Sequence, residues 1–148
     1  MQLPAVQTKF LDLPNSFSLR NGATLDKVRV AYEQYGTLTP NKDNAILLFH
    51  ALSGSQHAYG YNPEVPGIGS LWKPENHEGW WNSIIGPGKP LDTNCFCIIC
   101  ANYLGGCYGT TGPATPCPGT ASPTAPASLT WRSQTRHASR PFCWTAWA

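Results

Sequence analysis

Apolar and polar residues alternate from position 28 to 36, where the chain reads VRVAYEQYG. This period of two predicts a half-buried antiparallel strand. The dipeptide Asn21-Gly22 is a strong turn signal and separates this strand from another β-type run that starts with FSL at residues 17–19. Residues 17–36 are therefore expected to hold two β-type runs around a turn.

Two continuous apolar runs follow, AILLFHALSG at residues 45–54 and FCIICANYL at residues 96–104. The first suits a strand that is covered on both faces in a parallel sheet, and the second has the pattern of a buried strand. Two antiparallel strands that precede buried strands separated by crossovers indicate an α/β fold.

The segment between these runs has little helical periodicity. Residues 55–74 are rich in Gly, Pro, Tyr and His, which predicts a long loop, and loops of this length are usually functional or mobile. GWWNSIIG at residues 79–86 predicts a short helical turn whose Trp80 and Trp81 pack on the sheet.

The composition changes near Pro113. All eight acidic residues lie between Asp12 and Asp92, whereas the tail is mostly Pro, Ala, Ser and Thr and contains no Asp, Glu or Lys. We therefore divide the chain into a domain at 1–113 and a tail at 114–148 that is expected to be disordered.

The charge and the apolar runs limit the possible partners. A formal net charge of +2 is too small and too scattered to predict a polyanionic partner. Arg132, Arg136 and Arg140 are spaced by four, but they follow a Pro-rich run, so an unstructured basic tail is favoured over a nucleic-acid arm. The N-terminus lacks the apolar core of a signal peptide, and no apolar run approaches the roughly 18 residues of a membrane span. We expect a cytoplasmic protein without nucleic-acid or membrane partners.

The cysteines at 95, 97 and 100 have the spacing C-x-C-x-x-C within a strand-like run. Alternation along a strand places Cys95 and Cys97 on one face and Cys100 on the other, so their thiols would not converge on one zinc ion. Packed thiols are therefore favoured over a metal site.

Three segments carry a family resemblance: HALSG at 50–54, IIGPGKPLDT at 84–93 and NYLGGCYGTTGP at 102–113. They resemble the amino-terminal part of the homoserine O-acetyltransferase family, within the α/β-hydrolase superfamily, from about Phe17 through Pro113. The resemblance implies two antiparallel strands leading into parallel strands, in an incomplete sheet.

The resemblance also implies acetyl transfer from acetyl-CoA to the L-homoserine hydroxyl through a serine acyl-enzyme, in methionine biosynthesis. Close relatives use succinyl-CoA or act on serine. Acetyl-CoA is then a co-substrate with no further cofactor, and an intact enzyme is expected to form a homodimer.

HALSG occupies the place where this superfamily provides one amide of its oxyanion hole, the loop after the third strand. Leu52 is predicted to donate that amide, with Ala51 as the neighbouring alternative. Ser53 and Gly54 are expected to bind substrate by keeping the loop close to the acyl group. Judged from the residues alone, the segment could instead simply end a strand tightly.

The histidines before residue 80 are not assigned as the catalytic base, because the superfamily order along the chain is Ser, then Asp or Glu, then His. His50 is expected to be a hydrogen-bonded residue at a strand end. His57 and His77 are expected to be loop histidines.

The nucleophile expected from the resemblance is absent. No Gly-x-Ser-x-Gly occurs in the 148 residues, although the superfamily presents its serine on that motif. We therefore expect the chain as given to be inactive. We also expect poor solubility, because the AILLFHA strand would lack the neighbour that the nucleophile strand provides.

A frameshift explains the tail. Suitable codons for PGTASPTAPASLTW, read in a shifted frame, give a Gly-Lys-Pro-Tyr-Gly-containing segment that resembles the family. The alternative is a genuine Pro/Ser/Thr extension, but disordered segments are usually poor in aromatic residues, and the tail contains Trp131, Trp144 and Trp147.

Three classes of function stay open. The first is the truncated homoserine acyltransferase, which the three family-like segments favour. The second is a non-catalytic module that binds a partner through Trp80, Trp81 and the long loop. The third is a metal site on the cysteines.

Overall fold

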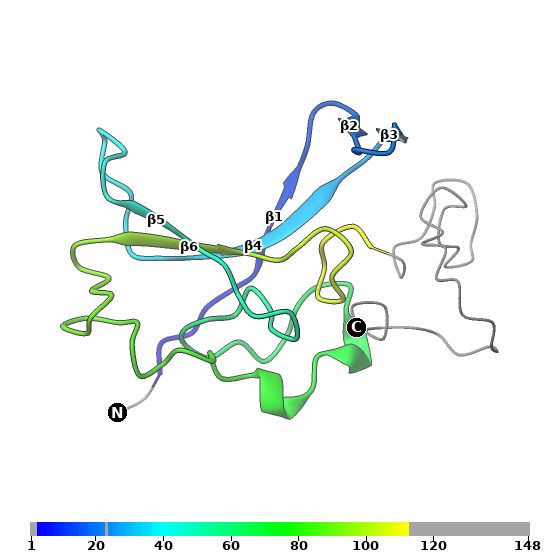
Figure 1. Ribbon diagram of the computed structural model, residues 1–148. Helices are drawn as coiled ribbons and strands as arrows, with labels where there is room; N and C mark the ends of the chain where they lie inside the picture. The colour runs from blue at the N-terminus through cyan, green and yellow to red at the C-terminus, as the bar shows by residue number, and fades with distance from the viewer. Residues whose placement is uncertain (1–2, 23, 113–148) are drawn as a thin grey trace.

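A computed structural model describes residues 3–22 and 24–112. Its main sheet has four strands in the order β1-β4-β6-β5 (Figure 1). The strands are β1 Lys9–Asp12, β4 Arg29–Tyr35, β5 Ala45–Leu48 and β6 Cys97–Ala101. β4 is antiparallel to both β1 and β6, whereas β5 and β6 are parallel. The expected incomplete sheet, in which antiparallel strands lead into parallel ones, is confirmed.

A separate two-stranded ribbon consists of β2 Phe17–Ser18 and β3 Thr24–Leu25. Gly22 lies in the turn with a φ of 84°, a left-handed conformation that glycine adopts readily. The predicted turn is therefore present. The long strand β4 does not pair across it, however, but with β1, which the sequence pattern did not predict.

β4 confirms the strand that the period-two pattern predicted, with an unexpected inward face. Ala31, Glu33 and Tyr35 are buried, whereas Val30 and Tyr32 are only half-buried. In the register with β6, Tyr35 pairs with Ile98 and Glu33 with Cys100. The central strand thus directs one carboxylate into the core.

β5 differs from the expectation of a strand covered on both faces. Leu47 is 58% exposed, and Phe49, just beyond the strand end, is 67% exposed. Within the described part of the chain β5 pairs only with β6. Its half-buried Ile46 and Leu48 pack on the core, so β5 is covered on one face and forms an edge of the sheet.

The crossover from β5 to β6 is a long loop with two short 3-10 helices, η1 Gly69–Leu71 and η2 Pro74–Asn76. No α-helix occurs in the described residues. The expected turn in GWWNSIIG is present, because the Ile85 amide donates to the Trp81 carbonyl at 2.9 Å. Trp81 packs on the core as expected, whereas Trp80 is 36% exposed.

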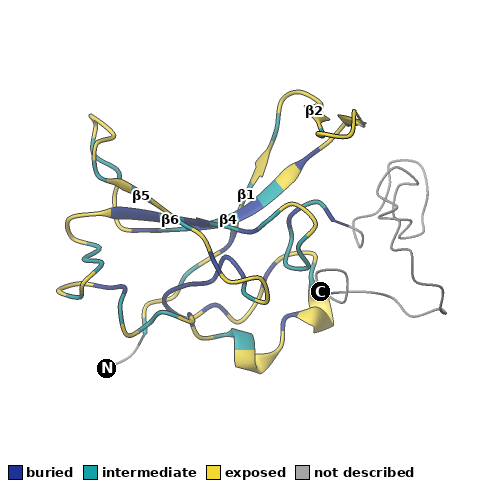
Figure 2. Ribbon diagram, viewed as in Figure 1, coloured by how far each residue is buried: buried dark blue, intermediate teal, exposed yellow. Residues whose placement is uncertain are grey.

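The core lies between one face of the sheet and the crossover loop, which Figure 1 shows beneath the sheet. It unites residues from β4, β6 and the loop: Tyr35, Ala58, Tyr59, Ile85, Ile98 and Cys100. The dark blue segments of Figure 2 follow β6, β4 and the inner part of this loop. Gly79 allows the loop to cross itself closely, since a Cβ there would collide with the Tyr59 backbone.

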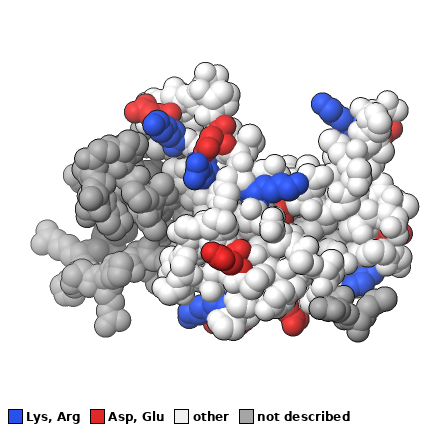
Figure 3. All heavy atoms as spheres, turned by 180° about the vertical axis from the view of Figure 1, so that it is seen from behind, with Lys and Arg blue, Asp and Glu red and all other residues white. Residues whose placement is uncertain are grey.

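Basic and acidic side chains are interspersed on the face seen in Figure 3, where most of the described surface is uncharged. No helix in the described residues is long and apolar enough to cross a membrane. The tail at 114–148, with its expected disorder, frameshift and basic character, lies outside the described residues.

Candidate functional site

The HALSG segment forms a tight turn directly after β5. The Gly54 amide donates to the Ala51 carbonyl at 2.8 Å. His50 is buried, and its Nδ1 donates to the Ala51 carbonyl at 2.7 Å. Its own carbonyl accepts a hydrogen bond from the Tyr103 hydroxyl at 2.6 Å. His50 is thus the hydrogen-bonded strand-end residue that the sequence predicted, and it fixes the start of the turn to the segment after β6.

Leu52 lies within this turn, with its side chain 46% exposed. Among the described residues, no acceptor is hydrogen-bonded to its backbone amide. Gly54 leaves room for this turn, because a Cβ there would lie tightly against its neighbours, 3.1 Å from the Ala51 carbonyl oxygen and 3.2 Å from the His50 Cβ. The turn therefore holds a backbone donor free, which is the property needed in an oxyanion hole.

Ala51, Ser53 and Gly54 line an open pocket of about 450 Å³. The opposite walls come from aromatic and polar side chains of the crossover and of the segment after β6: Phe49, Ser55, His57, Glu75, Asn76, Glu78, Trp80, Trp81 and Tyr108. Leu52 does not line this pocket. The structure thus brings the two predicted substrate residues together with aromatic walls that could enclose a small acyl group.

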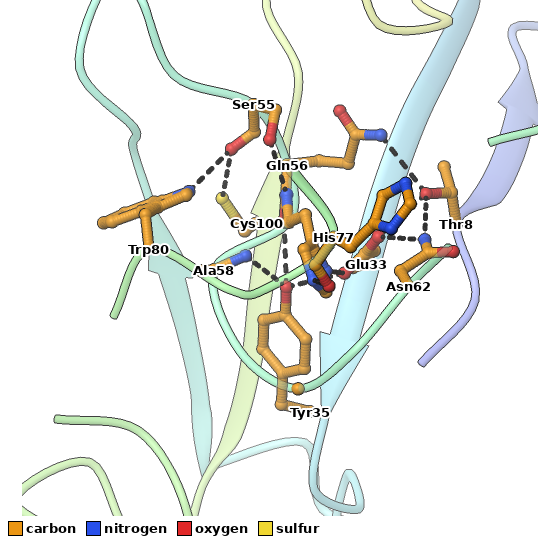
Figure 4. Close-up of polar contacts among 12 residues, drawn as sticks. Thr8, Glu33, Tyr35, Ser55, Gln56, Ala58, Asn62, His77, Trp80 and Cys100 are labelled. Atoms are coloured by element: carbon orange, nitrogen blue, oxygen red, sulfur yellow. Dashed lines mark hydrogen bonds and ion pairs between the residues drawn. The ribbon is translucent and has the colours of Figure 1, made fainter. Parts of the chain in front are cut away.

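Beneath this pocket lies a polar network that sequence analysis missed (Figure 4). Glu33 is fully buried, and its Oε1 accepts hydrogen bonds from the Thr8 hydroxyl at 2.8 Å and the Asn62 amide at 3.0 Å. Its Oε2 lies 2.8 Å from the Tyr35 hydroxyl and 2.7 Å from His57 Nδ1. The alternation at VRVAYEQYG did not identify Glu33, because the pattern alone does not show which face of the strand points inward.

His57 lies in the crossover loop, as expected from the sequence, but its side chain is buried. Its side chain is 1% exposed. Nδ1 faces Glu33, and Nε2 lies 3.0 Å from the His77 carbonyl. Nothing in the sequence indicated that this loop folds inward beneath the sheet. His77 is half-buried, with its ring against Tyr61.

The expectation of packed thiols is confirmed for two of the three cysteines. Cys97 and Cys100 are fully buried in β6, but Cys95 precedes the strand and is exposed. Burial, and secondly the negative charge of Glu33, raise the pKa of the Cys100 thiol to about 12. In the described residues, no group of three or more His, Cys, Asp or Glu side chains is placed to hold a metal ion.

No protein-family model matches the chain, but individual relatives do. The homoserine O-acetyltransferase of Deferribacter desulfuricans is 48% identical over 119 residues, which cover 80% of this chain and 29% of the relative. A homoserine O-succinyltransferase of Nocardioides sp. is 50% identical over 105 residues, covering 71% of this chain and 26% of the relative. The chain therefore spans less than a third of the length of these relatives.

Solved structures show the same relationship. The homoserine O-acetyltransferase from Bacillus anthracis aligns with a TM-score of 0.57 and 32% identity over 78% of this chain and 29% of that one. An esterase aligns with a TM-score of 0.60 and 34% identity over 76% of this chain and 30% of the other. The chain is thus homologous to the homoserine O-acetyltransferase family and forms the amino-terminal portion of an α/β-hydrolase fold.

Proposed function

We propose that this chain provides the oxyanion side of a homoserine O-acyltransferase, an enzyme that transfers an acyl group to the hydroxyl of L-homoserine in methionine biosynthesis. The observation that carries the proposal is the free backbone amide of Leu52. It lies in the turn after β5, next to Ala51, Ser53 and Gly54, which line the pocket.

The proposed chemistry follows from the charge that develops during acyl transfer. Attack on a thioester or ester carbonyl produces a tetrahedral intermediate whose oxygen is negatively charged. A fixed N–H donor directed at this oxygen lowers the barrier, and the loss of one such donor typically costs about 3–4 kcal/mol. Leu52 is our proposed donor, and the neighbouring Ala51 amide is the alternative. Ser53 and Gly54 would hold the turn close to the acyl group.

The donor in the proposal is acetyl-CoA, as co-substrate and without a further cofactor. Relatives with both acetyltransferase and succinyltransferase names match the chain, so succinyl transfer is the alternative, as is serine as the acceptor. The proposal further includes a cytoplasmic location and a homodimer for the intact enzyme.

The 148 residues contain no Gly-x-Ser-x-Gly, so we propose that they do not turn over substrate by themselves. The nucleophile, the acid and the base would be encoded in another reading frame downstream of the GTTGP segment. A genuine tail would instead favour the binding-module alternative, which the partly exposed Trp80 in the pocket wall also supports.

Nucleotide sequencing across the codons for residues 112–120 and beyond tests the frameshift directly. We expect another frame to open into Gly-x-Ser-x-Gly and later Asp and His codons. The frame-restored protein should then form O-acetylhomoserine from acetyl-CoA and L-homoserine, detected by mass spectrometry, and the 148-residue chain should not. Absence of such a frame, with stoichiometric ligand binding and no turnover, would favour the binding module.

The role of Leu52 can be tested in the frame-restored protein. Leu52→Pro removes the amide hydrogen, and we expect kcat to fall by about 10²–10³-fold. Leu52→Ala keeps the amide and is the matched control, expected to retain most of the activity because the side chain is exposed. Circular dichroism verifies that both variants fold. Equal activity of the two variants would remove Leu52 from the oxyanion hole.

A further inference from the structure

We propose that Glu33 and His57 form a buried carboxylate–imidazolium pair that positions residues 55–58, part of the pocket wall. The relevance of this pair to acyl transfer rests on the proposed function. Glu33 and His57 are therefore positioning residues, and neither is proposed to touch the reacting atoms.

The acceptor beside Nε2 of the His57 ring shows that this nitrogen carries a proton. Nε2 lies 3.0 Å from the His77 carbonyl oxygen, which can only accept a hydrogen bond. Nδ1 lies 2.7 Å from Glu33 Oε2. At this short distance one proton lies between Nδ1 and Oε2. It belongs either to the His57 ring or to the Glu33 carboxyl group.

The donors around Glu33 place that proton on the ring. Thr8 Oγ1 already accepts hydrogen bonds from Gln56 and Asn62, so its own proton is directed to Glu33 Oε1 at 2.8 Å. The Asn62 amide donates to the same oxygen at 3.0 Å. The Tyr35 hydroxyl lies 2.8 Å from Oε2. The Thr8 and Asn62 donors stabilise the ionised carboxylate, which leaves His57 as the cation.

Among the described residues, the other titratable groups near the pair carry no charge that competes with it. Burial is the main cause that raises the pKa of Tyr35 and of Cys100, and the charge of Glu33 contributes to both shifts. Both groups are therefore neutral at pH 7. His77 offers only its backbone carbonyl to the ring. One negative and one positive charge thus balance each other within the core.

Hydrogen bonds connect this pair to the pocket wall. The His57 amide donates to Ser55 Oγ at 3.2 Å, and the Ser55 carbonyl accepts from Trp80 Nε1 at 3.0 Å. Ser55, His57 and Trp80 all line the pocket. Figure 4 shows Ser55 and Trp80 in contact on the opposite side of the cluster from Thr8 and Asn62.

Tyr35 adds a second attachment from the same strand. Its hydroxyl accepts a hydrogen bond from the Ala58 amide at 2.7 Å and lies 2.9 Å from the Gln56 carbonyl. Glu33 therefore contacts His57, and Tyr35 contacts Gln56 and Ala58, so the two β4 residues together hold loop residues 56–58. Because β4 lies inside the sheet whereas β5 lies at its edge, the pocket wall is fixed to an interior strand.

The protonation state is tested by nitrogen NMR of the full 148-residue chain labelled with ¹⁵N-histidine. The chain has four histidines, so single His-to-Gln variants of the other three assign the His57 signal by elimination. We expect both ring nitrogens of His57 to carry protons at pH 7 and the ring to be neutral in Glu33→Gln. A neutral His57 ring in the unchanged chain would overturn the charged pair.

The positioning role is tested by hydrogen exchange. In Glu33→Gln we expect amides of residues 55–58 to exchange about tenfold faster, with β6 amides unchanged. His77→Gln is the matched control, because only the backbone of His77 contacts the pair, and it should leave both regions unchanged. Equal acceleration in β6 and the loop would show a merely structural role.

Tyr35→Phe provides a milder variant in case Glu33→Gln does not fold. It keeps the pair but removes the hydroxyl between Gln56 and Ala58. We expect the NMR signals of His57 to show that both ring nitrogens still carry protons. The backbone amides of residues 56–58 should exchange faster than in the unchanged chain. A neutral ring, or unchanged exchange at 56–58, would contradict the proposal. Neither measurement needs substrate, so a failure of acyl transfer would not affect them.

Discussion

Cys100 lies in the core, where burial and then the charge of Glu33 raise the pKa of its thiol from an ordinary value of 9.0 to about 12. Above pH 9 the unfolded chain loses this proton while the folded chain keeps it. The free energy of unfolding should therefore decline between about pH 9 and pH 12, by at most about 1.4 kcal/mol per pH unit from this group.

Urea unfolding followed by tryptophan fluorescence at several alkaline pH values measures this decline. Cys100→Ala should make it shallower, although the raised pKa of buried Tyr35 contributes further at the alkaline end. The control is Cys95→Ala, since Cys95 is exposed. The free energy of unfolding of this variant should decline with pH as it does in the unchanged chain. An identical decline in both variants would exclude Cys100 as the cause.

At the scale of single residues, the sequence indicated the HALSG turn and the hydrogen-bonded His50. It did not predict the partner of His57, because Glu33 and His57 are 24 positions apart. Their contact depends on the inward phase of β4 and on how the loop folds back beneath the sheet. The pattern of β4 is equally compatible with either phase, and only tertiary packing selects the one that buries a carboxylate.

At the scale of elements, β5 is an unprotected edge. Exposed apolar edges of this kind favour strand pairing between molecules. Leu47 is 58% exposed and lies on the face away from the core. Leu47→Lys should therefore reduce aggregation, measured by light scattering at equal protein concentration, because charged side chains discourage edge-to-edge pairing.

Ile46→Lys is the matched control on the same strand. Ile46 is half-buried and packs on the core, so a lysine there would place a charge among apolar side chains. We expect this variant to lose folded structure by circular dichroism, whereas Leu47→Lys keeps it. Aggregation of Leu47→Lys at the rate of the unchanged chain would show that the β5 edge is not responsible.

The elements themselves were predictable to different degrees. β4 and β6 follow from alternation and from a continuous apolar run, because both signals extend over several residues. β1 is four residues long. An apolar pattern over so few residues does not distinguish a strand from a chance arrangement. Whether one or both faces of β5 are buried could not be inferred from the sequence. This burial depends on neighbouring elements and not on the strand's own residues.

At the scale of the whole molecule, the described residues form a core on one face of the sheet. The opposite face bears residues such as Tyr32, Leu47 and Ile99, which are half-buried or exposed. Sheets with parallel strands are normally covered on both faces. The sequence resemblance anticipated this imbalance, because it ends near Pro113 and the homologous relatives are more than three times as long as the matched part.

This imbalance leads to a prediction about cooperative unfolding. The dependence of unfolding free energy on denaturant rises with the surface that folding buries. We expect the frame-restored protein to show a steeper transition and a higher midpoint in guanidinium chloride than the 148-residue chain, because added elements would cover β5 and the open face. Sedimentation of both samples before unfolding separates true stability from aggregation. If the 148-residue chain is instead a soluble monomer with an equally high midpoint, its one-sided core suffices for a stable domain, and the expected aggregation at β5 is wrong.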